Sequence, residues 1–296
     1  LKFYNYLNIN ADICISPGNP DYFAGFKGKQ INFLADLSSI RNEKFSSLNR
    51  YGKKIQKNIL KFGVKYADKT ICISNFTKND LSELYPEYKK KYTVVYNGIS
   101  DYWFDDKYIN NKPALDLKNK YGEYYIWWGA ISPRKNLIRL LKAYKNIISE
   151  NPSFPNLLIA GKPVFPYPEF EKTVKELSQK VIRLPFQEFK TLKGYIKESN
   201  AVLFPSLYEG FGLPVIEAYA LGKNVLFSDI TSLPEIGKNF GIKINPSDIN
   251  SILSGLIELN KNKNNFAKER QLYAKNFTYI KAAEQISDIT DSVYAK

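Results

Sequence analysis

The stretch FPSLYEGFGLPVIEAYALG, residues 204–222, decides the fold class of this chain. It follows directly on the apolar run Ala201–Phe204, which predicts a buried strand ending at the loop. Gly210 and Gly212 lie in that loop and let the backbone approach a ligand closely. A helix is then predicted over Pro214–Leu221, with the proline at its first position. The stretch therefore indicates a strand, a glycine loop and a helix, a unit typical of α/β proteins.

The same alternation of strand and helix runs through most of the chain. Further apolar runs predict strands at Asp12–Ile15, Ile31–Leu34, Thr70–Ile73, Thr93–Tyr96, Tyr125–Trp128, Asn156–Ile159 and Asn224–Phe227. Helices are predicted between them, including Asn75–Tyr85, capped by Ser74 and stopped by Pro86, and Leu137–Ser149. Strands separated by helices favour parallel sheets covered on both faces, so we predict the α/β class.

Length and composition are those of a globular protein. The chain has 296 residues, enough for about two domains, and 44% of them are hydrophobic. Cys14 and Cys72 are too few for a disulfide framework and predict buried free thiols in a reducing compartment. We see no signal peptide at the start and no apolar run near the ~20 residues of a membrane span, so a cytoplasmic location is expected.

The net charge of +14 predicts attraction to polyanions. The lysines are dispersed and carry no nucleic-acid-binding motif, so a nucleic-acid partner is not expected. Two interpretations stay open: a general lysine-rich bias, or peripheral contact with an anionic membrane at its inner face.

The segment Ser46–Ala67 is a predicted basic amphipathic helix. Its apolar residues recur at three- and four-residue spacing and are Leu48, Tyr51, Ile55, Ile59 and Phe62. Its lysines fall largely elsewhere and are Lys53, Lys54, Lys57, Lys61 and Lys65. It is either an ordinary surface helix or one that faces a membrane or another polyanion.

A domain boundary is predicted after Asn97–Gly98. The segment Asp101–Lys120 is polar, contains Pro113 and is expected to be irregular, and a new strand begins near Tyr124. We therefore predict a first domain over residues 1–105 and a second over 106–278.

The run WWGAISPRKN, residues 127–136, predicts an anion site. A strand ends at Gly129, and Arg134 and Lys135 stand just before the N-terminus of a helix. In open α/β sheets, ligands bind at the carboxyl ends of the strands. Two cations beside free backbone N–H groups suit a pyrophosphate, although by themselves they also fit a solvated pair.

Two carboxylates extend this site. Glu209 lies in the glycine loop and Glu217 on the helix that follows it. Carboxylates repel phosphate but accept hydrogen bonds from sugar hydroxyls, so the combination suits a nucleotide-sugar. The strand end LLIAGKP at 157–163 and the turn VIRLPF at 181–186 place more loops on the same edge, either as plain turns or as contacts to a base or ribose.

The spacing Glu209-x7-Glu217 within EGFGLPVIEA resembles the signature of family 4 glycosyltransferases, which have the GT-B fold. Three flanking runs agree with this signature: SNAVLFPSLYEGFGLP, ALGKNVLFSDITSLPEI and PSD (246–248). The run GAISPRKN is similar to that family's phosphate-binding loop. The run VVYNGIS (94–100) is similar to the end of the family's first domain. The resemblance runs from about residue 11 to the end. It implies two Rossmann-like domains with parallel sheets facing across a cleft, and a last helix, 279–296, that returns to the first domain.

The resemblance also implies roles for single residues. Arg134 and Lys135, in the loop that begins at Gly129, would neutralise the departing diphosphate, while Glu209 would bind the transferred sugar and Glu217 the ribose. The remaining donor-binding candidates are Gly129, then Phe211, Gly212 and Leu213 through their backbone, and Arg183 and Leu184 near the base. Family members are retaining and use no metal, so no metal site or cofactor is expected. The expected reaction is hexose transfer, with mannose favoured, from GDP-mannose or alternatively a UDP-sugar to a glycan or lipid-linked acceptor.

The sequence departs from the family pattern in the first domain. NFLADLSS (32–39) resembles a loop that often has His before Asp, but here Ala35 precedes Asp36, which we keep as a catalytic candidate. Tyr219 stands where the family often has Met, the first domain looks short at its start, and the chain has no His and no Met. Two alternatives follow: a nucleotide-sugar-binding relative with impaired catalysis, or an epimerase or glycan phosphorylase on the same fold. The cations together with both glutamates count against the second.

Overall fold

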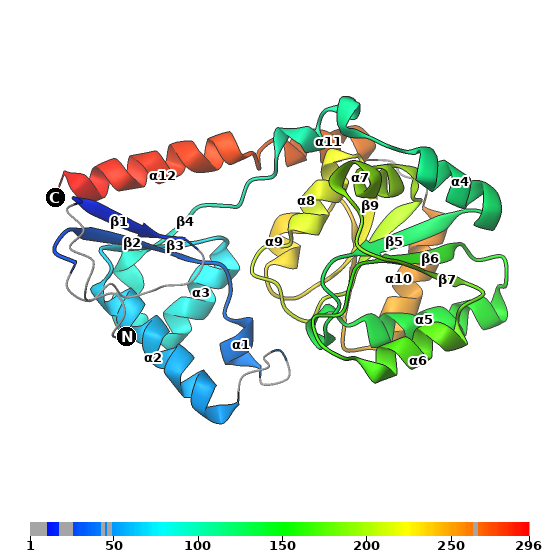
Figure 1. Ribbon diagram of the computed structural model, residues 1–296, viewed down its shortest axis with the longest axis horizontal. Helices are drawn as coiled ribbons and strands as arrows, with labels where there is room; N and C mark the ends of the chain where they lie inside the picture. The colour runs from blue at the N-terminus through cyan, green and yellow to red at the C-terminus, as the bar shows by residue number, and fades with distance from the viewer. Residues whose placement is uncertain (1–10, 18–25, 43–44, 46–48, 263–265, 296) are drawn as a thin grey trace. The chain divides into compact units, whose positions relative to one another are not determined.

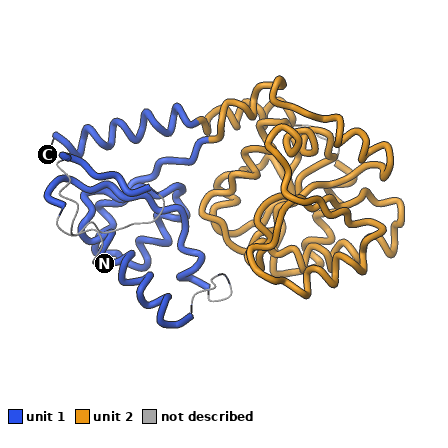
Figure 2. Tube along the Cα trace, viewed as in Figure 1, with its two compact units in different colours: residues 1–98, 279–296 blue, residues 99–278 orange. Residues whose placement is uncertain are grey.

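The computed structural model describes residues 11–17, 26–42, 45, 49–262 and 266–295. The chain forms two compact units, shown in different colours in Figure 2. Unit 1 consists of residues 1–98 and 279–296, and unit 2 of residues 99–278. The chain thus leaves unit 1 after Gly98 and comes back to it at Tyr279.

Unit 1 is built on a four-stranded sheet in which every paired strand is parallel to its neighbour. The strands lie in chain order: β1 (Ile13–Ser16), β2 (Lys29–Leu34), β3 (Lys69–Cys72) and β4 (Tyr92–Val94). The helices in the described part of this unit are α1 (Ser38–Arg41), α2 (Arg50–Tyr66), α3 (Asn75–Leu84), the 3-10 helix η3 (Pro86–Lys91) and α12 (Tyr279–Tyr294).

Successive side chains of a strand point to opposite faces of the sheet, and in unit 1 both faces carry apolar side chains. Helices therefore cover both faces of this sheet. On one face, Val293 of α12 packs with Ile31 and Ile71 in a buried cluster. On the other face, Leu60 of α2 packs with Leu34. Figure 1 shows the sheet between α12 and the pair α2 and α3.

Unit 2 contains a six-stranded parallel sheet in the order β10-β9-β8-β5-β6-β7. Its strands are β5 (Tyr124–Trp128), β6 (Asn156–Ala160), β7 (Val181–Leu184), β8 (Ala201–Phe204), β9 (Asn224–Ser228) and β10 (Ile242–Ile244). Its α-helices are α4 (Lys112–Tyr121), α5 (Leu137–Glu150), α6 (Pro168–Glu176), α7 (Phe189–Glu198), α8 (Leu213–Ala220), α9 (Leu233–Gly237), α10 (Ile249–Lys261) and α11 (Ala267–Ala274). Its 3-10 helices are η4 (Asp101–Trp103), η5 (Asp106–Tyr108) and η6 (Pro133–Lys135).

The strand order of unit 2 reverses between β5 and β8, which are neighbours in the sheet. From β5 the chain proceeds to β6 and β7 on one side, and from β8 to β9 and β10 on the other. The loops that follow β5 and β8 therefore diverge at one point of the carboxyl edge. Such a switch point opens a crevice in which α/β proteins bind ligands.

The structure confirms the predicted α/β class, and most expected strands lie within two residues of their observed bounds. Ser74 caps α3 as expected, since its hydroxyl accepts a hydrogen bond from the Thr77 N–H at 3.0 Å. Both cysteines lie in the described part, and neither forms a disulfide; Cys72 is buried and Cys14 partly buried.

Several predicted elements were wrong. Asp101–Lys120 is not irregular, because α4 begins at Lys112 and holds Pro113 in its first turn, where a proline costs no hydrogen bond. The run at 181–184 is the strand β7, and β10 was not predicted. Helix α8 begins one residue earlier than predicted, at Leu213, so Pro214 is its second residue.

The basic helix is also shorter than predicted. It begins at Arg50 with Asn49 as its cap, whose side chain accepts from the Gly52 N–H at 2.8 Å. The predicted start at Ser46, and Leu48 with it, lie outside the described residues.

Candidate active site

The loops after β5 and β8 are joined by a cluster of three charged side chains. The Lys135 ammonium lies 2.6 Å from Oε1 of Glu209, and the Arg134 guanidinium lies 3.1 Å from Oε2. Arg134 also donates to the Tyr208 carbonyl at 2.9 Å. Each carboxylate oxygen of Glu209 thus faces its own cation, and the cluster keeps one positive charge in excess.

Glu209 is charged in this setting. Burial raises the pKa of its carboxyl, but the charges of Lys135 and Arg134 lower it further, so the pKa lies below its usual value. The side chain of Glu209 is only 9% exposed. A charged cluster with so little water interacts more strongly than one at the surface, and its geometry is fixed before a ligand binds.

Polar side chains hold the two loops together behind this cluster. Asn136 has a left-handed backbone conformation (φ 59°), and its amide donates to the carbonyls of Pro205 and Pro246 at 3.0 and 2.8 Å. The Ser232 hydroxyl lies 2.9 Å from the carbonyl oxygens of Glu209 and Phe211. The bond from Asn136 to Pro205 ties the loop after β5 to the glycine loop, and Ser232 ties the glycine loop to the loop after β9.

Thr231 adds a strained contact to the same loop. Its hydroxyl accepts from the Glu209 N–H at 3.2 Å, and its φ of 59° is unusual for a β-branched residue. Strained residues of this kind persist where the surrounding structure demands them, often at functional sites.

Helix α8 presents its N-terminus at the end of the glycine loop. Its cap is Gly212, with φ 105° and ψ 48°, which has no side chain to accept from the first-turn N–H groups. A Cβ atom at Gly212 would lie 2.6 Å from Cδ2 of Leu233, so a larger residue would clash as well as being strained. The helix end is therefore suited to an anion near the cations.

Glu217, in the second turn of α8, has a different environment from Glu209. Oε2 of Glu217 accepts a hydrogen bond of 3.3 Å from the Trp128 indole N–H. Burial raises the pKa of Glu217 to about 7, and the indole bond opposes that rise. The two glutamates of the motif thus differ: one is held charged by two cations, and the other titrates near neutral pH.

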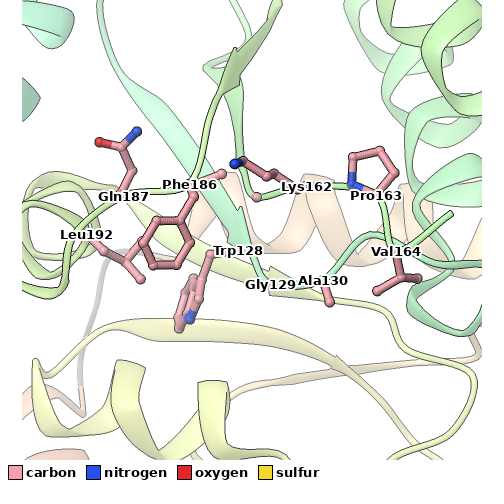
Figure 3. A pocket seen from close by; sticks show the side chains of 11 residues that line it. Trp128, Gly129, Ala130, Lys162, Pro163, Val164, Phe186, Gln187 and Leu192 are labelled. Carbon is pink, nitrogen blue, oxygen red and sulfur yellow. The ribbon is translucent and has the colours of Figure 1, made fainter. Parts of the chain in front are cut away.

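Beside Trp128 lies an apolar cavity of about 490 Å³ at the carboxyl ends of β5, β6 and β7 (Figure 3). It is lined by Trp128, Gly129, Ala130, Ala160, Gly161, Lys162, Pro163, Val164, Phe186, Gln187 and Leu192. Figure 3 shows the rings of Phe186 and Trp128 close to Leu192. The volume is in the range of pockets for small organic ligands.

Two glycines bring the loops of the cavity together. Gly129 and Gly161 have φ of 137° and 146°, and a Cβ atom at Gly161 would lie 2.0 Å from the Gly129 carbonyl oxygen. A side chain at Gly161 is therefore excluded, and the chain after β6 can approach the chain after β5.

Arg183 and Leu184, expected near the base, have structural contacts at the end of β7. The Arg183 guanidinium donates to the Gly161 carbonyl at 3.3 Å and lies 4.9 Å from the centre of the Phe170 ring. The Leu184 carbonyl accepts from the Gly161 N–H at 3.3 Å. The cavity lining includes Phe186, two residues further on, so the assignment of the base to Arg183 and Leu184 stays a prediction.

Asp36 belongs to unit 1 and the other site candidates to unit 2. Oδ1 of Asp36 accepts from the N–H and hydroxyl of Ser38 at 2.9 and 2.6 Å, at the start of α1.

Ala35, in the place of the expected His, is exposed after β2. Tyr219, the second departure from the family pattern, is buried and donates to the Gly237 carbonyl at 2.8 Å.

Sequence reasoning missed three contributors: Trp128, which links Glu217 to the cavity, Phe186 in the cavity wall, and Thr231. The tryptophan pair in WWGAIS was a signal, because the second tryptophan stands at the carboxyl end of the predicted strand, where α/β proteins bind ligands.

In the described residues, no group of three or more cysteine or acidic side chains could hold a metal ion. Asp105, adjacent to Asp106 in the sequence, pairs with Lys107 at 2.7 Å. No helix among those described is long and apolar enough to cross a bilayer.

Comparison with known proteins places this geometry in a family. Residues 110–277 match the family described as glycosyl transferases group 1. The O-antigen chain mannosyltransferase RfbU of Salmonella typhimurium is 29% identical over 199 residues, which are 67% of this chain and 52% of that protein. The chain spans about half the length of the curated relatives it matches first.

Solved structures share the fold at low identity. Sucrose-phosphate synthase from Thermosynechococcus elongatus matches with a TM-score of 0.73 at 19% identity, over 92% of this chain and 69% of that one. HepE from Anabaena, in complex with UDP and glucose, matches with a TM-score of 0.72 at 16% identity, over 90% and 72%. These likenesses confirm the predicted GT-B fold.

The family match covers more than half of the chain and includes both glutamates, the two cations and the switch-point loops. The chain belongs to the glycosyl transferases group 1 family.

Proposed function

We propose that this protein is a retaining glycosyltransferase that moves a hexose from a nucleotide-diphosphate sugar to a glycan or lipid-linked acceptor. One observation carries the proposal: at the switch point of unit 2, a cationic cluster around Glu209 stands beside the uncapped N-terminus of α8. Glu217, on the same helix, connects through Trp128 to an apolar cavity. Together these features match a ligand with an aromatic base, a ribose, phosphates and a sugar.

The parts of such a donor have separate partners. The apolar cavity suits a base, because aromatic and aliphatic side chains line it. Glu217 accepts hydrogen bonds from ribose hydroxyls, and Glu209 does so from the transferred sugar. Arg134, Lys135 and the N–H groups at the start of α8 bind the diphosphate.

Lys135 and Arg134 would do the main electrostatic work of the reaction. As the bond from the sugar to the diphosphate breaks, negative charge grows on the leaving oxygen, and fixed cations in a water-poor site stabilise that charge. The leaving phosphate takes the proton of the acceptor hydroxyl, which attacks from the same face of the sugar. The chain supplies positioning and charge, with no side-chain nucleophile and no metal ion.

Mannose is the favoured sugar, because the similar RfbU is a mannosyltransferase of O-antigen chains. GDP is the carrier that the resemblance of the sequence favours. A UDP-sugar is the alternative, since the HepE structure holds UDP and glucose. The basic surface favours a lipid-linked or otherwise anionic acceptor and peripheral contact with an anionic membrane.

Calorimetric titration with GDP, UDP and ADP tests the donor site. We expect one diphosphate to bind, and Lys135→Ala to weaken it by about 10- to 100-fold, the range for a lost charge-assisted hydrogen bond. Lys142→Ala, at an exposed position of α5, is the matched control and should bind as the wild type does. If none of the three binds, or if both variants bind equally, the proposed donor site is wrong.

A second titration and a turnover assay separate transfer from binding alone. Ala35 in place of the expected His favours, as the second candidate, a nucleotide-sugar-binding protein without turnover. Release of the nucleotide diphosphate from its sugar, with the sugar appearing on an added acceptor or water, supports the transferase. Tight binding of the nucleotide-sugar with no release over many hours supports the second candidate.

A further inference from the structure

Helix α2 of unit 1 exposes an apolar stripe on the side away from its own sheet. Its buried residues are Leu60, Gly63 and Val64, which face the core. Four large side chains point elsewhere and are 40–72% exposed: Tyr51, Ile55, Phe62 and Tyr66. They recur at the four- and seven-residue spacing of one helix face, and we call them the outer stripe. An ordinary surface helix would instead turn its apolar stripe inward.

The charge of α2 is of one sign. The helix has 17 residues, with one Arg and five Lys and no acidic residue. Four lysines of α2 are exposed, and each directly precedes a residue on or beside the outer stripe: Lys54, Lys57, Lys61 and Lys65. They form a second line along the helix, which we call the lysine row. An apolar line beside a cationic line is the arrangement of helices that lie in a membrane interface.

The residue types also favour a bilayer over a protein partner. Tyr51 and Tyr66 stand at the two ends of the outer stripe, and tyrosine is enriched at the headgroup level of membranes because its ring is apolar and its hydroxyl polar. Lysine stems can lie along apolar surface while the ammonium groups reach the phosphates. Among the described side chains of the helix, none offers an anion that would repel lipid phosphate.

We propose that α2 docks the protein on anionic lipid, with the outer stripe in the interface and the lysine row on the headgroup phosphates. The helix would lie parallel to the membrane plane over about 25 Å, at 1.5 Å per residue. This rests on the membrane contact proposed above and names the surface that makes it; it concerns unit 1 alone and needs no donor.

Vesicle co-sedimentation tests the docking. The full chain is mixed with vesicles of phosphatidylcholine with phosphatidylglycerol, or of phosphatidylcholine alone, without any nucleotide. We expect binding to the anionic vesicles that weakens as salt rises. Each lysine near an anionic surface contributes about fivefold, so reversing Lys54, Lys57 and Lys61 to Glu should lower the partition coefficient by at least about 100-fold.

The stripe is tested separately. Ile55→Ser with Phe62→Ser keeps the charge and should lower the partition coefficient by about tenfold, because apolar area no longer enters the interface. Leu115→Ser with Leu272→Ser, also at exposed sites, is the matched apolar control. The matched control for the charge-reversal variant replaces three exposed lysines of unit 2 with Glu: Lys172, Lys175 and Lys268. Circular dichroism checks that each variant is folded.

The outcomes decide the proposal. Loss of binding in both α2 variants, with both controls unchanged, supports it. An equal loss in the charge control would mean attraction by dispersed charge and would overturn it. Wild-type binding by the Ile55→Ser, Phe62→Ser variant would mean that α2 contacts any polyanion without insertion, and would also overturn it, as would failure of the wild type to bind anionic vesicles. None of these results bears on the donor site, which the nucleotide titration tests.

Discussion

Replacing Glu217 with Gln should change how the stability of unit 2 depends on pH. Burial raises the pKa of this carboxyl from 4.5 to about 7. Between these two pH values the folded protein therefore binds more protons than the unfolded chain, and the stability of the wild type falls as pH rises. Glutamine does not titrate, so the Glu217→Gln variant lacks this fall.

The size of the effect follows from the two pKa values. At about 1.4 kcal/mol per pKa unit, the gap between 4.5 and about 7 corresponds to at most about 3.5 kcal/mol. The free energy of unfolding of Glu217→Gln, relative to the wild type, should thus rise by about 2 to 3 kcal/mol between pH 4.5 and pH 8. Above pH 8 the difference should be constant.

Urea unfolding followed by tryptophan fluorescence is a direct assay. The three tryptophans, Trp103, Trp127 and Trp128, all belong to unit 2, so their emission reports that unit by itself. Glu150→Gln, at an exposed position at the end of α5, controls for the lost charge. If the curves of Glu217→Gln and the wild type run parallel from pH 4.5 to 8, the carboxyl does not titrate near neutrality and the reasoning fails.

Two further variants probe the same helix. Trp128→Phe removes the indole N–H that donates to Glu217 but keeps an aromatic ring in the cavity wall. Because that bond opposes the rise in the pKa of Glu217, the pH range over which stability falls should move upward in the same urea series. An unchanged pH range would show that the bond has no electrostatic effect. Gly212→Ala places a Cβ atom 2.6 Å from Leu233 at a φ of 105° and should lower the free energy of unfolding by about 2 kcal/mol or more. Gly222→Ala, where the nearest atom would be 3.3 Å away, should cost less, and an equal cost would refute the clash.

The strands of unit 2 could be predicted because their signal is local. Runs such as Ala201–Phe204 are short, apolar and bounded by turn residues, and the structure finds them buried throughout. The loop with Glu209 and the helix with Glu217 were recognisable from the spacing of the two glutamates together with the residues that flank them. By contrast, β10 has three residues with Lys243 exposed between two buried isoleucines, so it gave no apolar run.

The first turn of α4 shows a different limit. In a polar segment Pro113 predicts irregular chain, but a proline at the start of a helix removes only an N–H that has no helical partner. Only the position of the helix start distinguishes the two cases, and the polar residues around Pro113 left that position undefined.

The partners within the site were beyond the reach of sequence patterns. Lys135 and Glu209 are 74 residues apart, and their pairing depends on β5 and β8 being neighbours in the sheet. The link from Trp128 to Glu217 depends on the same adjacency. A motif identifies which residues matter, but the strand order determines which of them meet.

The chain path through the two units bears on how the protein folds during synthesis. Unit 2 is one continuous segment, residues 99–278, so it can fold as soon as that segment has left the ribosome. Unit 1 must wait longer, because Val293 completes the buried cluster that holds Ile31 and Ile71. Until residue 293 is made, one face of the sheet of unit 1 stays uncovered, and a chaperone would find apolar strands there while unit 2 is already native.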